Sequence, residues 1–541
     1  MTVNPSGLAI PLFLILMLFE YLVLKWQGKD LHRYNDSVNS LSMGLLLLTS
    51  DALLKATTFG VFIYLYNDFR VMEFATNEII TWVVFFFGVD LCYYWFHRCA
   101  HEYNILWGAH VGHHQSEEYN LTTALRQSAF QYGFSWVFYL PLAILGCPPE
   151  VFLGQFVLLK LYQFWLHTQL VNKIPFIEGI FSTPSSHRVH HAKNPVYIDR
   201  NYGGTLVIWD RIFGSWQPEL PQEKCHYGTT QPLESLSPIK ANLQHWSMLL
   251  KDMLYTQSYK DKCLLWIKPT GWRPEDCLHY TSTQQVSQQT QLQPILQHDG
   301  CDDRKKYDPK TSFKVNAYAG FSLISIALFA IMFLFDSPTL SALELTAGVF
   351  SIVFGVVMLS RFLENRFQFW WFEFVRWPIF AVLFWHLATA SGPNQIQQTI
   401  TINKPANVIF EYVTVPNLWH EWHPQSLSVT PARLSSFQEG QTFDEVIQTS
   451  FGKDDMSWVV EVNDPGKQWI ARAYNHTKGV DIRLRYDLTV QGEKTVFQRT
   501  LDYEMPNFIL RVANFIYFKQ YMISQSWHSL ESLKAHVEKY K

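Results

Sequence analysis

The sequence of 541 residues has little cysteine and little net charge, and both shortages exclude classes of protein. Its seven cysteines are an odd number without C-x-x-C spacing, which argues against a disulfide framework and a zinc knuckle. Reduced thiols facing the cytosol are the simplest interpretation. The formal net charge of -3 is close to neutral, so the composition predicts no nucleic-acid partner.

The N-terminus lacks the marks of a cleaved signal peptide. No basic residue precedes its first apolar run, and no small-residue cleavage site follows it, so we expect a retained membrane helix. Aromatic residues are abundant instead, with 41 Phe, 26 Tyr and 20 Trp. They gather in long apolar runs of the kind that cross membranes.

These runs predict a mainly α-helical, multi-pass membrane protein, because about 20 apolar residues span the hydrocarbon core of a bilayer. The candidate segments are residues 7–25, 41–66, 79–96, 130–145, 151–170, 317–335, 342–360 and 372–390. The Gly/Pro break GCPPE makes the fourth and fifth segments a re-entrant or spanning hairpin. One of the last three segments is re-entrant in one interpretation, and all three span in the other.

Histidine is concentrated in two stretches that share a spacing. Residues 97–114, HRCAHEYNILWGAHVGHH, hold a pair and a triplet, and SSHRVHH at 185–191 repeats the triplet. An H-x-x-H-H pattern is expected by chance roughly 0.03 times in this chain, so two copies indicate a function. Positions three and four apart share a helix face, so each cluster is expected to point its imidazoles at a common centre.

Nine imidazoles are candidate metal ligands: His97, His101, His110, His113, His114, His167, His187, His190 and His191. Imidazole suits Fe, Zn, Cu and Ni, so the ligand type does not choose the metal. One ion takes about four to six ligands, so nine suggest two ions sharing one site. The segment 79–96 runs straight into His97, which places this site at the membrane edge, within reach of a lipid.

Basic residues flank the segments that carry the histidines. They are Lys25, Lys29, Arg33, Arg126, Lys173, Arg188, Lys193 and Arg200. Positive charge near short membrane ends marks the cytosolic side, so the histidine cluster is expected on the cytosolic face.

The order H-x3-H, H-x2-HH, isolated His and H-x2-HH on a membrane scaffold resembles the fatty acid hydroxylase and sterol desaturase superfamily of membrane di-iron oxygenases. The alkylglycerol monooxygenase family within it is a closer match. That match is carried by DLCYYWFHRCAHEYNILWGAHVGHHQSEEYNLTTALRQS, TPSSHRVHHAKNPVYIDRNYGG, WDRIFGSW and GWRP. The resemblance covers about residues 5–390 and is strong over 88–216.

This resemblance implies two iron ions, held by the eight motif histidines with His167 as a ninth ligand. It implies insertion of one oxygen atom from O2 into a lipid C–H bond, in the nearer family beside the ether oxygen of an alkylglycerol lipid. It also implies a reduced pterin (tetrahydrobiopterin) or another electron donor, although no separate pterin motif is visible. Two alternatives remain: a sterol or fatty-acid desaturase or hydroxylase of the same superfamily, and a non-enzymatic, membrane-tethered lipid-binding or lipid-transfer protein.

Two acids are candidate catalytic residues. Glu102 matches a family carboxylate beside the first motif, and an interfacial salt bridge explains it equally well. Asp90 lies seven residues before His97, on about the same helical face, and an intramembrane acid is a functional-site hypothesis by default. We expect Asp90 to accept a hydrogen bond from an imidazole and so orient that ring, with a bond to a neighbouring helix as the alternative.

Polar residues trail the second triplet in HHAKNPVYIDRNYGG, where a pair of glycines marks a turn. Asn194, Asp199, Asn201 and Tyr202 are expected to hold the ligand loop in shape rather than to touch substrate.

From about residue 396 the pattern changes to alternating strands, which predicts a separate α+β domain. The strands are QQTITINK, TFDEVIQT, MSWVVEV, QWIARAY, VDIRLRYDLTV and TVFQRTLDY. A short helix, PANVIFEYV, is expected to carry Pro405 in its first turn. A long amphipathic helix over 506–540 is expected to place Trp527, Leu530, Leu533 and Val537 on one face.

This pattern resembles the helix-grip fold of polyketide-cyclase and START-like (SRPBCC) domains. The resemblance implies a lipid-binding or lipid-presenting module with Trp419, Trp422 and His423 near its rim. The sequence HEWH is not H-E-x-x-H, so a zinc-protease interpretation fails on spacing.

We therefore divide the chain into a membrane di-iron oxygenase domain (1–316), additional transmembrane helices (317–395) and a helix-grip domain (396–541). The stretch 283–297 is expected to be a loose linker.

Overall fold

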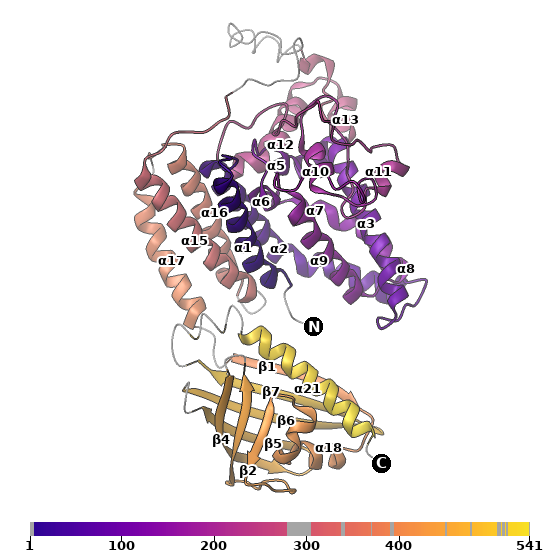
Figure 1. Cartoon of the computed structure of the whole chain (residues 1–541), viewed down its shortest axis with the longest axis vertical. Helices are drawn as coiled ribbons and strands as arrows, with labels where there is room; N and C mark the ends of the chain where they lie inside the picture. Colours follow the sequence, from indigo (N-terminus) through magenta and orange to yellow (C-terminus); the bar gives the residue numbers. More distant parts are fainter. Residues whose placement is uncertain are drawn as a thin grey trace. The chain divides into compact units, whose positions relative to one another are not determined.

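The computed structural model describes residues 5–278, 305–336, 341–368, 370–389, 394–449, 452–475, 479–505, 510, 514 and 518–539 (Figure 1). The chain divides into two compact units, one of residues Pro5–Phe380 and one of Ala381–Lys541. The stretch 283–297, expected to be a linker, lies outside the described residues.

The first unit is helical. Its described helices are α1 (Pro5–Trp26), α2 (Tyr34–Phe69), α3 (Ile79–Glu102), α4 (Asn104–Gly108), α5 (Val111–His114), α6 (Leu121–Ala124), α7 (Gln131–Ser135), η1 (Trp136–Tyr139), α8 (Leu140–Leu145), α9 (Pro149–Leu166), α10 (Pro184–His191), α11 (Ile208–Ile212), α12 (Pro238–Tyr255), α13 (Tyr259–Ile267), α15 (Phe313–Asp336) and α16 (Ala342–Leu363). A further helix, α17 (Phe372–Thr389), runs on into the second unit.

Three of the described helices are long and apolar enough to cross a bilayer: α3, residues 313–333 of α15, and α16. The segment expected over 130–145 is not one helix, because α7, η1 and α8 succeed one another there. Together these three reach about 22 Å, which is too short for a hydrocarbon core of about 30 Å.

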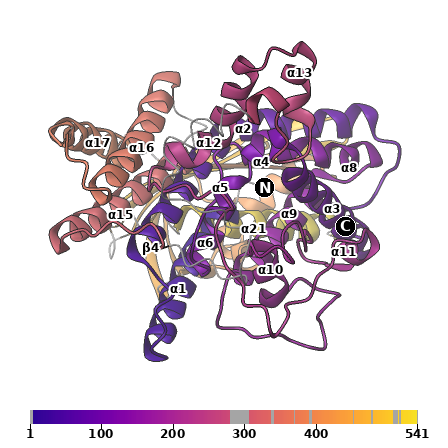
Figure 2. The ribbon, with the colours of Figure 1, turned by 90° about the horizontal axis from the view of Figure 1, so that it is seen from above.

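The apolar helices pack through aromatic side chains. Along α3 and α9, a core forms around buried Phe85, Val89, Leu142 and Val151. Helices α15 and α16 stand side by side, on one side of the helices that carry the histidines (Figures 1 and 2). His97 and His101 lie near the C-terminal end of α3, beyond Phe85 and Val89 of this core.

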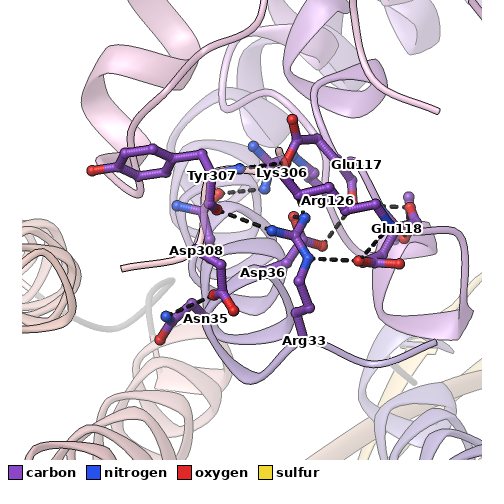
Figure 3. Close-up of polar contacts among 12 residues, drawn as sticks. Arg33, Asn35, Asp36, Glu117, Glu118, Arg126, Lys306, Tyr307 and Asp308 are labelled. Carbon is purple, nitrogen blue, oxygen red and sulfur yellow. Dashed lines mark hydrogen bonds and ion pairs between the residues drawn. The ribbon is translucent and has the colours of Figure 1, made fainter. Parts of the chain in front are cut away.

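An ion-pair network ties the start of α2 to the turn that follows α5 (Figure 3). Arg33 donates to Glu118 over 2.5 Å and to Glu117 over 3.1 Å, and Lys306 reaches Glu118 over 2.8 Å. The backbone N–H of Tyr307 donates to Glu117 over 3.0 Å. Because Glu118 is buried, these cations compensate a carboxylate that burial alone would make costly. The network holds Lys306 and Tyr307 beside the turn that follows α5, the helix of His113 and His114.

The second unit contains one antiparallel seven-stranded sheet with the order β1-β7-β6-β5-β4-β3-β2. Its strands are β1 (Asn394–Ile402), β2 (Ser426–Thr430), β3 (Thr442–Thr449), β4 (Gly452–Asp464), β5 (Gln468–Asn475), β6 (Val480–Gln491) and β7 (Lys494–Glu504). Its helices are α18 (Ala406–Val413), η3 (Pro416–Leu418), α19 (Trp419–Trp422) and α21 (Lys519–Lys539). All six expected strands are confirmed, and the short strand β2 is an addition.

Helix α21 lies across one face of this sheet and closes its core (Figure 1). Leu530, Leu533 and Val537 are buried there as expected, whereas Trp527 is 36% exposed and bonds Glu531 instead. The expected rim position of Trp419 and Trp422 is wrong, because both indoles are buried in the core. The rim position expected for His423 is wrong as well, because His423 is buried and bonds Ser529. Pro405 precedes α18 as its N-cap instead of lying in its first turn. His420 is exposed.

Candidate metal centre

All nine predicted histidines come together in the first unit, and none is more than 6% exposed. They form two groups, in each of which the candidate ligand atoms lie within 4.8 Å of one another. The first histidine group is His97, His101, His110, His114 and His190. The second histidine group is His113, His167, His187 and His191. The sequence motifs therefore mark one continuous site with two possible ion positions.

The expectation that each triplet serves a common centre is wrong. In each triplet the first and third histidines, which are four residues apart, belong to the same group, whereas the second histidine belongs to the other group. His110 and His114 belong to the first group and His113 to the second; His187 and His191 belong to the second and His190 to the first. Successive residues of a helix are about 100° apart, so neighbouring histidines must diverge. Each triplet thereby links the two groups.

One turn orients three rings of the first group. The ring nitrogen Nδ1 of His97 donates to the carbonyl of Tyr202 over 2.8 Å, and that of His190 donates to the carbonyl of Arg200 over 2.9 Å. The carboxylate of Asp199 lies 3.5 Å from Nδ1 of His101. Asp199 and Asn201 both have φ of 57°, a left-handed conformation that Asp and Asn tolerate better than most residues. The expectation that this loop is held in shape for the ligands is consistent with these contacts.

In the second group, two rings face each other in a way that hydrogen bonding cannot explain. Nδ1 of His113 donates to the carbonyl of Arg126 over 2.8 Å, and Nδ1 of His167 donates to the carbonyl of Gln163 over 2.9 Å. The side-chain nitrogen of Gln127 also lies 3.2 Å from His113 Nδ1, farther away than the Arg126 carbonyl. A carbonyl only accepts, so in each neutral ring the proton sits on Nδ1, the Gln127 amide presents its oxygen to that proton, and Nε2 is a bare lone pair. Those two Nε2 atoms are 3.3 Å apart. Two lone pairs this close repel unless a cation lies between them.

Burial keeps the imidazoles neutral. Desolvation, followed by the charges of neighbouring groups, lowers the pKa well below 6.5 for His110, His113, His114, His187, His190 and His191. Among the described residues, no hydrogen-bond partner is found for His101 Nε2, His190 Nε2, His191 Nε2, His110 Nδ1 or His187 Nδ1. Buried nitrogens without partners are costly, and neutral imidazole is the form that binds a metal. The donor set fits a metal ion.

Two buried acids hold the loop after the second triplet. Asp210 accepts from the N–H groups of Tyr202 and Gly203 over 2.7 and 2.8 Å, and from the hydroxyl of Ser215 over 2.7 Å. Burial raises the pKa of Asp210 to about 6, although these three hydrogen bonds lower it. Asp90 accepts from the N–H groups of Thr205 and Leu206 over 2.7 and 3.1 Å, and from the Trp209 indole over 3.0 Å. The loop is thus fixed on both sides of the glycine pair.

The two candidate acids contact the site indirectly. The hydrogen bonds of Asp90 join α3 to the 205–209 segment, as the alternative interpretation expected, and none of those described reaches an imidazole. Glu102 accepts from Arg98 over 2.9 Å, which is the interfacial salt bridge. Asp210 was missed because WDRIFGSW gives no local sign that its acid folds back onto Tyr202.

The helix that carries the second triplet starts at a strong local signal. Thr183 caps α10 by accepting from the N–H of Ser186, and the Ser186 hydroxyl accepts from the N–H of Thr183. Pro184 occupies the first turn, where its missing N–H costs nothing. The sequence TPSS therefore sets the start of α10 and with it the direction of all three histidines.

Comparison with known families agrees with this geometry. The fatty acid hydroxylase family model matches residues 82–215, which include all nine histidines. A model described as polyketide cyclase/dehydrase and lipid transport matches residues 394–538. The fold and the site thus define a lipid hydroxylase with apolar membrane helices, joined to a START-like domain.

Individual relatives narrow this class. Alkylglycerol monooxygenase of Xenopus tropicalis is 39% identical over 323 residues, covering 59% of this chain and 69% of that protein. The Homo sapiens enzyme is 42% identical over 268 residues, covering 49% of this chain and 59% of that protein. A Delta(7)-sterol 5(6)-desaturase of Aspergillus fumigatus is 28% identical over 185 residues, covering 32% of this chain and 48% of that protein. The chain belongs to the alkylglycerol monooxygenase family and is an oxygen-dependent lipid monooxygenase, an oxidoreductase.

Replacing Asp210 with Asn is expected to loosen the turn that orients His97. Both carboxylate oxygens accept from N–H or O–H groups, so either orientation of an amide sets its NH2 against a donor. Losing such support typically weakens metal binding about 10- to 100-fold. Titration of the metal-free protein with ferrous iron measures this, with exposed Asp68→Asn as the matched control. An affinity equal to that of the control would remove the assigned role of Asp210.

Proposed function

We propose that the two histidine groups hold two iron ions and that the protein hydroxylates a lipid C–H bond, beside the ether oxygen of an alkylglycerol lipid. The observation that carries the proposal is the pair of bare Nε2 atoms of His113 and His167, 3.3 Å apart. Imidazole nitrogens bound side by side to one ion at about 2.1 Å lie about 3.0–3.4 Å apart. The contacts of His97 with His110 and of His187 with His167, at 3.0 and 3.1 Å, have the same spacing.

The grouping supports two ions rather than one. Five nitrogens in the first group and four in the second match the usual ligand numbers of separate ions. Iron bound there supplies the activation of O2. The overall reaction balances as one O2, one C–H bond, two electrons and two protons, giving one alcohol and one water.

The chain's own residues orient the rings and exclude water. The carbonyls of Tyr202 and Arg126 hold the protons of His97 and His113 on the outer nitrogens, so the inner nitrogens keep their lone pairs. The rings of Trp107 and Tyr119 lie 5.0 Å from His101 and 5.3 Å from His191, respectively. These aromatic walls keep solvent from a reactive centre. Asp90 has a positioning role through the 205–209 segment, and Glu102 one through Arg98.

A reduced pterin, tetrahydrobiopterin, or another donor supplies the electrons in this proposal. Support for a pterin comes from the family resemblance, while the balance of the reaction requires only a two-electron donor.

The iron content of the purified protein tests the metal assignment. We expect about two iron ions per chain, and His167→Ala is expected to reduce occupancy of the second histidine group first, because it removes one of four ligands. Exposed His420→Ala is the matched control and is expected to keep both ions. Wild-type protein without iron after growth in iron-replete medium would contradict the proposal.

A second candidate is a sterol or fatty-acid desaturase or hydroxylase, favoured by the sterol desaturase relative. Turnover under ¹⁸O2 separates hydroxylation from desaturation, because only hydroxylation places label in the lipid. We expect labelled product from an alkylglycerol lipid before it fragments. An unlabelled alkene product would favour the desaturase.

We further propose a multi-pass protein whose histidine face is cytosolic, with the domains divided at residues 316 and 395. Basic residues beside the membrane segments, Lys25 and Lys29 among them, support this orientation. If all three late segments span, a reporter fused after residue 395 is expected on the non-cytosolic side; if one is re-entrant, it is expected in the cytosol. A reporter inserted after Gly271 is expected in the cytosol in either case, and its exposure on the other side would overturn the orientation.

A further inference from the structure

The largely apolar helix α9 carries one lysine. Lys160 lies on α9, seven residues before His167, so about 10 Å of helix separates their levels. Its ammonium lies 5.0 Å from the ring centre of Tyr93 and 5.5 Å from that of Phe156. It donates to the side-chain oxygen of Gln163 over 3.2 Å.

This ammonium has donors to spare. An ammonium group carries three N–H donors, and Gln163 takes one of them. Within the part of the chain that the structure describes, no ion pair joins Lys160 to a carboxylate. A charged group among apolar side chains is costly to bury, and such groups recur at functional sites. Lys160 is therefore suited to an oxygen acceptor that comes from outside the protein.

Lys160 connects to both histidine groups through its two neighbours. The ring of Tyr93 lies 5.2 Å from the ring of His97, in the first histidine group. The backbone carbonyl of Gln163 accepts from His167, in the second histidine group. An acceptor bound at Lys160 would thus lie near Tyr93, whose ring packs against His97, and about two turns of α9 before His167.

A largely apolar crevice shares one wall residue with this lysine site, because Phe156 lines the crevice and its ring also faces the ammonium of Lys160. It runs between α2, the 131–145 segment and α9, and Phe156 is part of its wall. The lining also includes Phe59, Phe62, Tyr132, Tyr139, Phe152 and Leu153. Tyr132 and Phe156 lie 6.2 Å apart, centre to centre. Nine of the twelve lining residues are aromatic or Leu, and Asp51, Thr58 and Ser135 are the polar exceptions. Walls that are mostly aromatic and aliphatic accept an alkyl chain.

We propose that this crevice binds the alkyl chain of the lipid substrate and that Lys160 donates a hydrogen bond to the oxygen atom next to that chain. The occupant is a lipid with an ether or hydroxyl oxygen at the head of an alkyl chain. This inference rests on the proposed function, because it assumes that the histidine groups oxidise a lipid carbon.

The pairing sets which carbon is oxidised. A site built to hydrogen-bond an oxygen rejects a ligand that offers a methylene there, because the donor is then left without a partner. The alkyl chain alone would slide along the apolar crevice, since every methylene makes similar contacts. The oxygen at Lys160 fixes the register and presents the adjacent carbon to the histidine groups.

Replacement of Lys160 with Met tests the inference, because Met keeps the length and removes the donors. We expect kcat/KM for an alkylglycerol to fall about 10- to 100-fold, mostly through KM, as for loss of a hydrogen bond to a charged group. Oxygen is expected to appear at several carbons of the chain instead of one. Lys251→Met, at an exposed lysine of α12, is the matched control and is expected to match wild type. Unchanged KM and a single oxidised carbon in K160M would overturn the role of Lys160.

A second pair of variants tests the crevice. Leu153→Trp fills it, while Leu158→Trp adds the same bulk on the exposed side of α9, where Leu158 is 55% exposed. An alkylglycerol with a diazirine at the end of its chain is expected to label the peptide around 152–156 on illumination. Leu153→Trp is expected to reduce this labelling several-fold and Leu158→Trp to leave it. Labelling elsewhere would place the chain in another cleft.

The failures are distinguishable. Wild-type protein without iron or oxygen-dependent turnover contradicts the proposed function. A K160M variant with normal iron content and normal product contradicts only this inference.

Discussion

The structure depends on two nitrogen lone pairs that face each other in a buried space. His113 and His167 each direct a proton outward to a backbone carbonyl, so neither can donate across the 3.3 Å between their Nε2 atoms. Burial also lowers the pKa of His113 well below its ordinary value, so protonation does not relieve the repulsion. The protein tolerates this arrangement because the surrounding helices fix the rings and because a cation would turn repulsion into binding.

Much of the remaining architecture keeps those rings in place. The turn at 199–202 supplies carbonyls to His97 and His190, and Asp210 fixes that turn by accepting a hydrogen bond from the N–H of Tyr202. Asp90 anchors the next residues to α3, so the membrane helix and the polar loop are joined by a buried carboxylate. Gly204 permits the close approach, because a Cβ there would lie 2.7 Å from both Leu159 and Tyr93. Backbone carbonyls orient His97 and His190 rigidly without adding charge beside those two rings.

The second unit is stabilised mainly by an apolar core. Its sheet and α21 enclose a core that contains Trp422, Trp469 and Tyr486, all buried. The family model for lipid transport matches almost all of this unit. The aromatic core explains why Trp419 and Trp422, which the helix-grip resemblance placed near a rim, lie inside: large apolar rings gain more from burial than from exposure at an opening.

The sequence by itself determined the nine histidines, the strands of the second unit and the apolar runs, because each is a local pattern with a known period. It also determined the family, since the spacing of the histidine motifs is visible in the sequence and needs no three-dimensional contacts to be recognised. Only the tertiary structure decided how the triplets divide between two groups, because the 100° turn between neighbouring residues sends His113 and His114 to different partners. It alone gave Asp210 and Lys160 their places, since both act across elements separated in sequence. Local pattern records which side chains are available; packing decides which of them meet.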